Sequence, residues 1–270
     1  MRRLGLSALM ICILGAGSVR AAQWTNEGGI QTGSGLLSYH ESGAGNGGAR
    51  HTLWTVSGDI QASLSGPGSG PFTAIRLFYG TDLPGEEHWK DPTQMNHLSV
   101  RIFSPELRAG YRLSDASIAR WSVDPYVFLA FRWQWFSRSD FVVGGVPLTF
   151  GNVDETFRLP EGGGGVKGRL ALNDGITLYL GGHYGRIFEG KVINDLFPDF
   201  KLATEGNHLH GEGGLSFRID RGTSIAVGYS YDQILLKGTE FEFVPPFFLV
   251  AFPNSKTKMS YGYLRLTQMF

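Results

Sequence analysis

Two strictly alternating segments, residues 206–219 and 223–232, constrain the fold of this chain more than any other feature. In the first segment, one face carries Leu209, Leu215, Phe217 and Ile219, and the other carries His208, His210, Glu212 and Arg218. The second segment alternates in the same way from Ser224 to Asp232. A period of two residues is typical of a β-strand. The link Asp220-Arg221-Gly222 predicts a hairpin with Ile219 opposite Thr223 and Gly222 in the left-handed conformation.

Such a hairpin has one apolar face and one charged face. In a water-soluble sandwich the charged face would point outward, whereas in an outer-membrane barrel it would point into the interior. The rest of the chain decides between these two possibilities.

The N-terminal residues predict a secretory signal peptide. Arg2 and Arg3 precede a short apolar run from Leu4 to Ala16, and Val19 and Ala21 fit a cleavage site. We therefore expect residues 1–21 to be removed and residues 22–270 to form a single domain. Cys12, the only cysteine, lies in the leader, so the mature chain would have neither disulfides nor thiolate ligands.

The composition favours a transmembrane β-barrel. Removing Arg2, Arg3 and Arg20 from the 24 basic residues leaves 21 against 24 acidic ones, a net charge of −3 without long charge runs. This balance gives no support to nucleic-acid binding. The chain has 39 glycines and 13% aromatic residues, and after the leader no apolar run is long enough for a helical span.

The alternating segments number about ten, with eight or twelve as alternatives, and predict an all-β, antiparallel up-and-down transmembrane barrel. The strongest segment, residues 123–135, ends in Trp133 and Trp135, which are typical of an interfacial aromatic girdle. The connections alternate between short and long, as in outer-membrane barrels. The expected short turns are 65–71, 114–120, 173–175 and 220–222, and the expected long loops are 41–50, 81–96, 137–154, 190–204 and 236–255.

Two strands show irregularities. In residues 97–113 the apolar positions shift by one after Ser104-Pro105, which predicts a β-bulge there. In residues 155–172 the run Gly162–Gly165 lacks the Lys-Ser/Thr of a phosphate-binding loop, so we expect a close approach or a kink of the backbone.

The C-terminus resembles the signal by which bacterial outer-membrane proteins are recognised for insertion. The chain ends in Phe270 on an amphipathic strand with Leu264 and Leu266 facing outward, although Gln268 departs from the usual apolar residue. The resemblance is to the class and to no single family. It implies a bacterial outer-membrane location, with lipid and lipopolysaccharide around the barrel and the barrel-insertion machinery as a partner of the last strand.

The polar faces place many charged residues inside such a barrel. The basic side chains expected to line the lumen are Arg76, Arg101, Arg108, Arg112, Arg132, Lys167, Arg169, Arg218 and Arg265. Because a barrel of about ten strands is narrow, these side chains would largely fill it. They predict either an internal ion-pair network or a narrow passage, open, gated or plugged, for small anionic solutes.

One group of polar residues could carry chemistry. The hairpin register places His210 opposite Asp232, with His183 on the preceding strand and His208 and Glu212 on the same face, all near the long-loop rim. Candidate acid/base residues are His183, His210, Glu212 and Asp232, and weak metal candidates are His208, His210 and Glu212. A His beside an Asp resembles omptin-type surface proteases, but paired aspartates do not accompany it, so none of that family's sites is carried over.

The segment 239–253 is rich in phenylalanine around Pro245-Pro246, and it suggests either docking of a protein partner or an inward plug. The residues expected to contact a partner are Phe243, Phe247, Phe248 and Phe252. Three functions therefore stay open: a non-enzymatic passage, an outer-membrane lipid- or peptide-modifying hydrolase, and an assembly partner. We favour the passage, lean against an enzyme, and expect neither a cofactor nor a metal.

Overall fold

The computed structural model describes residues 23–270 apart from 43–45, 66–68, 91–92, 115–119, 150, 197–200, 240–241, 245–247 and 251. The leader 1–21 therefore lies outside the described residues. In the described part, no helix is long and apolar enough to cross a membrane.

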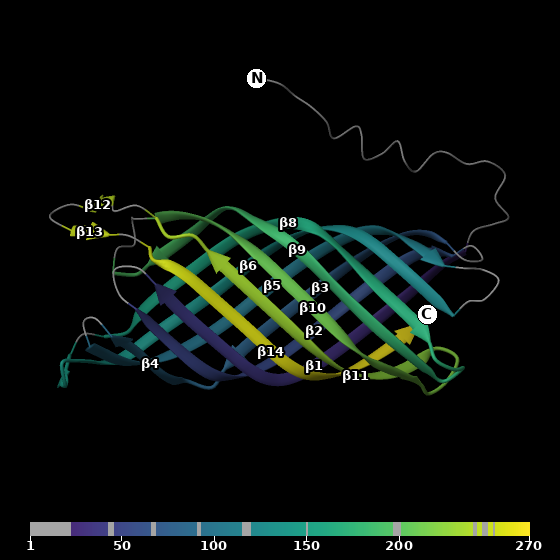
Figure 1. The fold of residues 1–270 in the computed structure, drawn as a ribbon, viewed down its shortest axis with the longest axis horizontal. Coiled ribbons are helices and arrows are strands. Elements are labelled where there is room, and N and C mark those ends of the chain that lie inside the picture. Colours follow the sequence, from purple (N-terminus) through teal and green to yellow (C-terminus); the bar gives the residue numbers. More distant parts are fainter. Residues whose placement is uncertain are drawn as a thin grey trace, which may run out of the picture.

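Ten long antiparallel strands close into a barrel, as the alternation predicts (Figure 1). They are β1 (Gln23–Ser42), β2 (Gly47–Ser65), β3 (Gly70–Asp82), β5 (Thr93–Ser114), β6 (Trp121–Val143), β8 (Val153–Ala171), β9 (Ile176–Asn194), β10 (Lys201–Arg218), β11 (Thr223–Leu236) and β14 (Asn254–Met269). The barrel closes because β1 pairs with both β2 and β14. Closure satisfies the backbone groups that an open sheet edge would expose.

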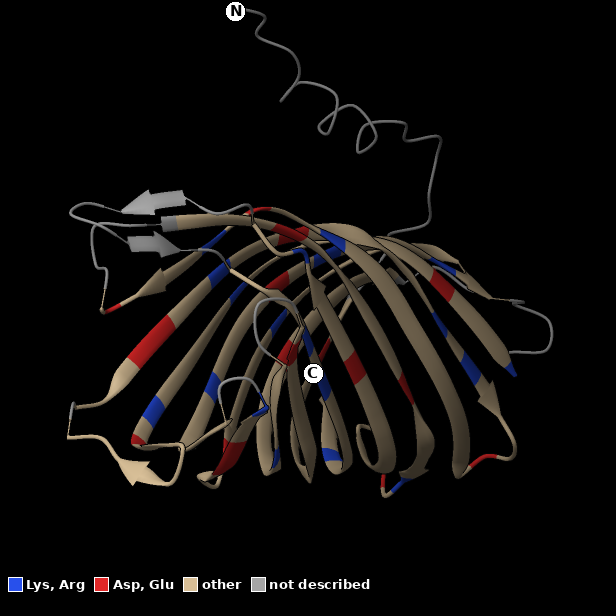
Figure 2. Ribbon diagram, turned by 60° about the vertical axis from the view of Figure 1, so that its left-hand side comes forward, with Lys and Arg blue, Asp and Glu red and all other residues tan. Residues whose placement is uncertain are grey.

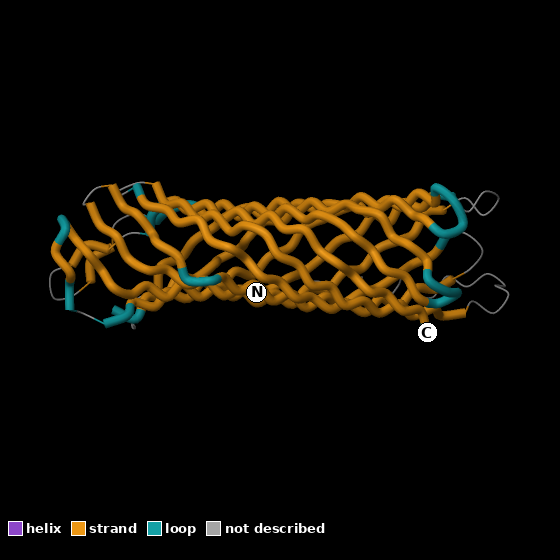
Figure 3. Tube along the Cα trace, turned by 90° about the horizontal axis from the view of Figure 1, so that it is seen from below, coloured by secondary structure: helices purple, strands orange, loops and turns teal. Residues whose placement is uncertain are grey.

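The remaining strands are short. The strand β4 (Gly85–Lys90) continues β3 between β2 and β5 after a break at Leu83-Pro84. The strand β7 (Val146–Pro147) pairs with the end of β6, and β12 (Glu242–Val244) and β13 (Phe248–Val250) form a separate hairpin. Loops lie at the two ends of the elongated barrel (Figure 3).

The strands extend well beyond the predicted segments. The ranges 81–96, 137–154 and 190–204, expected as long loops, consist largely of strand. The longest strand, β6, has 23 residues, although a tilted strand needs only about 9–11 residues to cross the hydrocarbon of a bilayer. The strands of 18 to 23 residues therefore extend well past the thickness of a membrane, whereas β3 and β11, with 13 and 14 residues, exceed it by only a few residues.

The outer surface has two zones. Toward the short turns, an apolar belt is exposed, and its members include Ile30, Ile60, Val127, Leu129, Leu180 and Leu264, each more than half exposed. Toward the long loops, most outward positions are polar or charged, as at His40, Arg50, Arg101 and Lys191.

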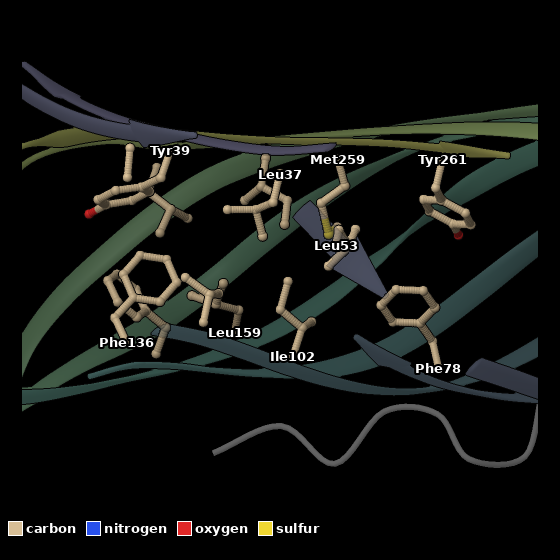
Figure 4. Close-up of a cluster of buried hydrophobic side chains, with 14 of the residues drawn as sticks. Leu37, Tyr39, Leu53, Phe78, Ile102, Phe136, Leu159, Met259 and Tyr261 are labelled. Atoms are coloured by element: carbon tan, nitrogen blue, oxygen red, sulfur yellow. The ribbon is translucent and has the colours of Figure 1, made fainter. Parts of the chain in front are cut away.

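The interior inverts this distribution. Beside the apolar belt most inward side chains are polar or charged, apart from a small apolar cluster of Phe72, Tyr126 and Phe128. Toward the long loops an apolar layer crosses the interior, and each of the ten barrel strands contributes to it. Its members, all at most 8% exposed, are Leu37, Leu53, Phe78, Ile102, Phe136, Leu159, Ile187, Leu202, Ile234 and Met259. In Figure 4, Leu37 and Met259 on one wall face Leu159 and Ile102 on the opposite wall. Burying each such side chain contributes about 1.5–3 kcal/mol.

The inversion explains the shift that was interpreted as a bulge at Ser104-Pro105. That prediction is wrong: β5 pairs with β3 without a register shift from Arg101 to Arg112. Val100 and Ile102 point inward into the apolar layer, whereas Leu107 points outward into the belt. The side chains alternate continuously, and it is the apolar environment that changes sides.

The hairpin of β10 and β11 has the predicted pairing, since Ile219 N donates a hydrogen bond to the carbonyl oxygen of Thr223. Gly222, however, does not adopt the left-handed conformation that we expected. The Asp220 carboxylate instead holds the turn by accepting hydrogen bonds from the backbone N–H groups of Gly222 (2.8 Å) and Thr223 (2.7 Å).

The two outer zones should respond differently to charge. We expect Val127→Arg, in the middle of the belt, to lower the free energy of unfolding in lipid vesicles by about 2–4 kcal/mol. We expect Ala203→Arg, on the outer surface toward the long loops, to change it by less than about 0.5 kcal/mol. Denaturant titration of the refolded variants measures both values, and equal costs at the two positions would contradict the zonation.

Candidate functional site

The candidate site is a histidine cluster inside the barrel, formed by Glu161, His183, His208, His210 and Asp232. The strand register places His210 opposite His183 on one side and opposite Asp232 on the other, which confirms the predicted pairing. Strand β8 adds Glu161. All five side chains are at most 6% exposed.

Hydrogen bonds join the members of this cluster. The ring of His208 lies between two carboxylates, with Nδ1 2.6 Å from Glu161 Oε1 and Nε2 3.0 Å from Asp232 Oδ1. His210 Nδ1 also lies 3.0 Å from Asp232 Oδ1. The rings of His183 and His210 stack with their centroids 4.7 Å apart. Asp232 therefore joins two histidines and fixes the orientation of both rings.

Two features differ from the expectation. Glu212, predicted to belong to the cluster, lies apart from it and pairs with Lys167 at 3.4 Å, because it is one inward position further along β10. The cluster also does not lie at the rim. Ile234 and Leu236 follow Asp232 on the inward face of β11, so the apolar layer separates the cluster from the long-loop end.

Sequence reasoning placed Arg132 and Tyr126 in the lumen but did not connect either of them with the histidine cluster, and it missed Glu161 altogether. Arg132 Nη2 lies 3.3 and 3.4 Å from the two ring nitrogens of His208, and Tyr126 Oη lies 3.2 Å from His183 Nδ1. The available signal was the alternation of β8, in which Glu161 shares the inward face with Gly163 and Gly165.

The run Gly162–Gly165 makes room for the cluster, as a close approach requires. Strand β8 continues through it without interruption. A Cβ atom on Gly165 would lie 2.6 Å from the Cβ of His183 and 2.7 Å from Tyr126 Cζ. On the facing strand, a Cβ atom on Gly185 would overlap with Glu161 Oε1. Only glycine fits these two positions without displacing the site.

The cluster includes a possible metal-ligand group. One ligand atom each from Glu161, His183 and His208 lies within 4.8 Å of the others. The guanidinium of Arg132 stands beside this group, 3.9 Å from Glu161, and His208 already bridges two carboxylates. Protein donors therefore occupy the places at which a cation would be held, and the residues do not fit a metal well.

Most of the other lumenal cations have carboxylate partners, and Figure 2 shows basic and acidic residues interspersed along the strands. The pairs are Arg108–Glu106, Arg112–Asp124 (3.2 Å), Lys167–Glu212 (3.4 Å), Arg169–Glu27 (3.7 Å) and Arg265–Asp59 (2.8 Å). These contacts support the ion-pair network. Arg101 was assigned to the lumen wrongly, because it points outward, and Arg218 is exposed at the short-turn mouth.

Three adjoining cavities follow the interior from the short-turn end. The first, about 250 Å³, lies at the mouth, and it shares Lys167, Arg169 and Arg265 with a second cavity of about 30 Å³. The second shares Arg76 with a third of about 20 Å³, which reaches the histidine cluster. The apolar layer closes the far side, so the described cavities form a dead-end path.

A second charged cluster, the Arg138 cluster, lies above the apolar belt toward the long loops. Arg138 Nε contacts Glu87 at 2.6 Å, Nη1 contacts Glu155 at 2.5 Å, and Nη2 lies 3.5 Å from Glu41. Burial, together with the neighbouring carboxylates of Glu155 and Glu87, raises the pKa of Glu41 to about 8 in spite of Arg138. The neutral carboxyl is thus the favoured form of Glu41 in the folded barrel.

Comparison with known proteins shows the fold. No family model and no curated protein matches the chain. The solved structure of the outer membrane protease OmpT from Escherichia coli is similar with a TM-score of 0.62 and 9% identity, covering 93% of this chain and 98% of that one. The transport unit of the autotransporter AIDA-I from Escherichia coli is similar with a TM-score of 0.41 and 9% identity, covering 97% and 94%. The chain has the barrel fold of bacterial outer-membrane proteins.

The glycines of the site offer a matched test. We expect Gly165→Ala to lower the free energy of unfolding by about 1–3 kcal/mol, because its Cβ would displace His183 or Tyr126. The control Gly164→Ala places a Cβ on the outward side, 3.5 Å from the nearest atom, and should cost nothing measurable. Unfolding titrations in the same detergent compare the two, and equal losses would contradict the packing of the site.

The Arg138 cluster predicts a pH dependence. Because the folded state raises the pKa of Glu41 from 4.5 to about 8, it binds a proton more tightly than the unfolded state does. The contribution of Glu41 to the free energy of unfolding should be largest below about pH 4.5 and should be lost as the pH rises to about 8. Glu41→Gln should remove this part of the dependence of the free energy of unfolding on pH, which denaturant titrations at a series of pH values measure.

Glu86→Gln is the control for this pH profile, because Glu86 is exposed and pairs only with the exposed His88. It should leave the slope unchanged. A Glu41→Gln profile that superimposes on that of the unmodified protein would disprove the assignment.

Proposed function

We propose that the protein is a bacterial outer-membrane β-barrel that is closed along its axis and presents an anion-binding vestibule to the periplasm. The apolar layer is the observation on which this proposal depends. It crosses the interior with side chains that are 0–8% exposed, and each barrel strand contributes to it.

The outer surface supports the membrane placement. Contiguous exposed apolar side chains of this extent indicate a lipid or protein contact, and here they surround a barrel without an open edge. Trp133 packs against Phe103 and Phe131 toward the upper side of the belt, as expected of a girdle. Asn26 and Phe270 exchange backbone hydrogen bonds of 3.3 and 3.0 Å, so both ends of the described chain lie together on the short-turn side of the barrel. In this placement the short-turn side faces the periplasm.

The vestibule is the cavity of about 250 Å³ at the short-turn mouth, a size suited to small solutes. Its basic side chains are Lys167, Arg169, Arg218, Arg221 and Arg265, and its acidic ones are Glu27, Asp174 and Asp220. Arg218 and Arg221 are exposed there. The excess of basic side chains, concentrated in a concave surface, favours small anionic solutes.

A conducting passage receives less support than a closed vestibule, because solute would have to part the apolar layer. The hydrolase receives less support as well, since the cavity at the histidine cluster, about 20 Å³, admits one or two waters but neither a lipid nor a peptide.

Docking of a partner through the Phe-rich loop stays a prediction. Phe247 and the side chains of Phe243 and Phe248 lie outside the described residues. Phe252 is 3% exposed and packs on Phe157 with ring centroids 5.6 Å apart, which suits a plug better than a partner contact. Cleavage after Ala21, contact with lipopolysaccharide, and recognition of the last strand by insertion machinery are also proposals.

Planar-bilayer recording tests whether the barrel is closed. We expect the refolded protein to insert without ion conductance, because the apolar layer leaves no hydrated path. Insertion is checked independently by protection of the strands from protease. Steady anion-selective steps from the inserted, unmodified protein would contradict closure and restore the passage.

Anion titration tests the vestibule. We expect the double variant Arg169→Gln/Arg218→Gln to bind a small carboxylate such as succinate at least tenfold more weakly than the unmodified protein, because each charge-assisted hydrogen bond contributes about 1.5–3 kcal/mol. The control is Arg101→Gln/Arg158→Gln, two exposed arginines on the outer surface. Calorimetry in detergent gives the affinities, and equal binding by both variants would rule out the vestibule as the binding site.

A further inference from the structure

We infer that the cavity at the inner end of the vestibule is a binding site for a single monatomic anion of chloride or bromide size, held by Arg76, Arg132 and His183. The inference rests on the proposed vestibule, since it assigns the innermost position of the same path. It concerns a different set of side chains from those at the mouth.

The first argument is an excess of unpartnered donors. Arg132 Nε and Nη1 and His183 Nε2 are buried without a hydrogen-bond partner among the described residues. Arg132 and His183 are 5% and 4% exposed, and both line the cavity. A guanidinium N–H can only donate, so an acceptor is required at this place. A buried donor left without one costs about 1–3 kcal/mol.

The tautomer of His183 follows from its neighbour. Tyr126 Oη lies 3.2 Å from Nδ1 of His183, and a phenol donates readily to an unprotonated ring nitrogen. The proton of a neutral ring is then on Nε2, which becomes a donor into the cavity. Tyr126 thus positions His183 to donate to an acceptor.

The second argument is charge. Arg76 lines both inner cavities and makes no hydrogen bond or salt bridge to any described residue. The carboxylates that line the third cavity are already engaged: Glu106 with Arg108, and Asp232 with His208 and His210. Arg132 reaches its nearest carboxylate only at 3.9 Å. Two guanidinium groups therefore line this cavity beside two carboxylates that are each engaged through one oxygen. The unpartnered nitrogen atoms of Arg132 and His183 at this place are donors, which favours an anion over a metal cation.

The third argument is size. A cavity of about 20 Å³ exceeds the 10–15 Å³ that one water needs, but it leaves no room for the oxygens of phosphate or sulfate. Phe78 borders the same cavity with an apolar ring, and Tyr261 adds a hydroxyl that is buried without a hydrogen-bond partner among the described residues. A halide fits the volume and can accept hydrogen bonds from several donors.

Bromide locates the site directly. Crystals of the full barrel grown in bromide should show an anomalous peak in the cavity beside Arg76, Arg132 and His183. In solution, the melting temperature should rise with chloride or bromide and saturate, but it should not rise with gluconate at equal ionic strength, because gluconate cannot enter. Arg76→Gln should weaken the halide dependence at least tenfold, and the outer-surface control Arg158→Gln should not change it.

Each outcome decides the inference. The absence of an anomalous peak, together with equal melting temperatures in bromide and gluconate, would mean that the cavity holds water only and would overturn the halide site. If Arg76→Gln does not fold, the bromide peak and the melting temperatures of the unmodified protein in chloride, bromide and gluconate still test the halide site. If succinate still binds but halides have no effect, only the inner halide site is disproved. If halides have an effect but succinate does not bind, the anion-binding vestibule is disproved.

Discussion

The fixed alternation of β-strand side chains determines most of this structure. Because successive side chains point to opposite faces, a strand that leaves the lipid must exchange the polarity of its two faces while its backbone continues unchanged. The ten barrel strands make this exchange at a common height. On the short-turn side of this exchange, lipid-facing apolar side chains surround a largely charged interior. On the long-loop side, polar outward side chains surround the apolar layer.

The exchange has direct consequences for function. Charged side chains at the height of the belt must lie inside the barrel, where they pair with one another as in Arg265 with Asp59. The apolar layer then closes the interior above them. What remains is a blind path that opens at the short turns, with exposed arginines at its mouth and the histidine cluster at its end. This geometry supports retention of a small anion better than its passage.

Much of the barrel could be predicted from the sequence. The local alternation predicts the strands. Counting residues outward from the turn 220–222 predicts the pairs His210–Asp232 and Ile219–Thr223, which the structure contains. The errors arose where the apolar side chains of a strand change from the outward to the inward face, because the sequence does not show which face meets lipid. The shift at Ser104-Pro105 is indistinguishable in sequence from a bulge, and Arg101 was placed inside for the same reason. Glu161 and Arg132 lie on β8 and β6, two and three strands away from His208 on β10, and alternation cannot show which residues of non-adjacent strands lie at the same position along the barrel axis.

A nitroxide scan along β5, at residues 97–109, tests the exchange of polarity most directly. Cys12 is the only native cysteine, so single-cysteine variants are simple to make. The structure predicts unbroken alternation: even positions buried throughout, odd positions from 105 to 109 accessible to oxygen in lipid, and 97 to 101 accessible to a water-soluble nickel chelate. Lipid accessibility at 98, 100 and 102, with a slip of one residue at 104–105, would contradict the account.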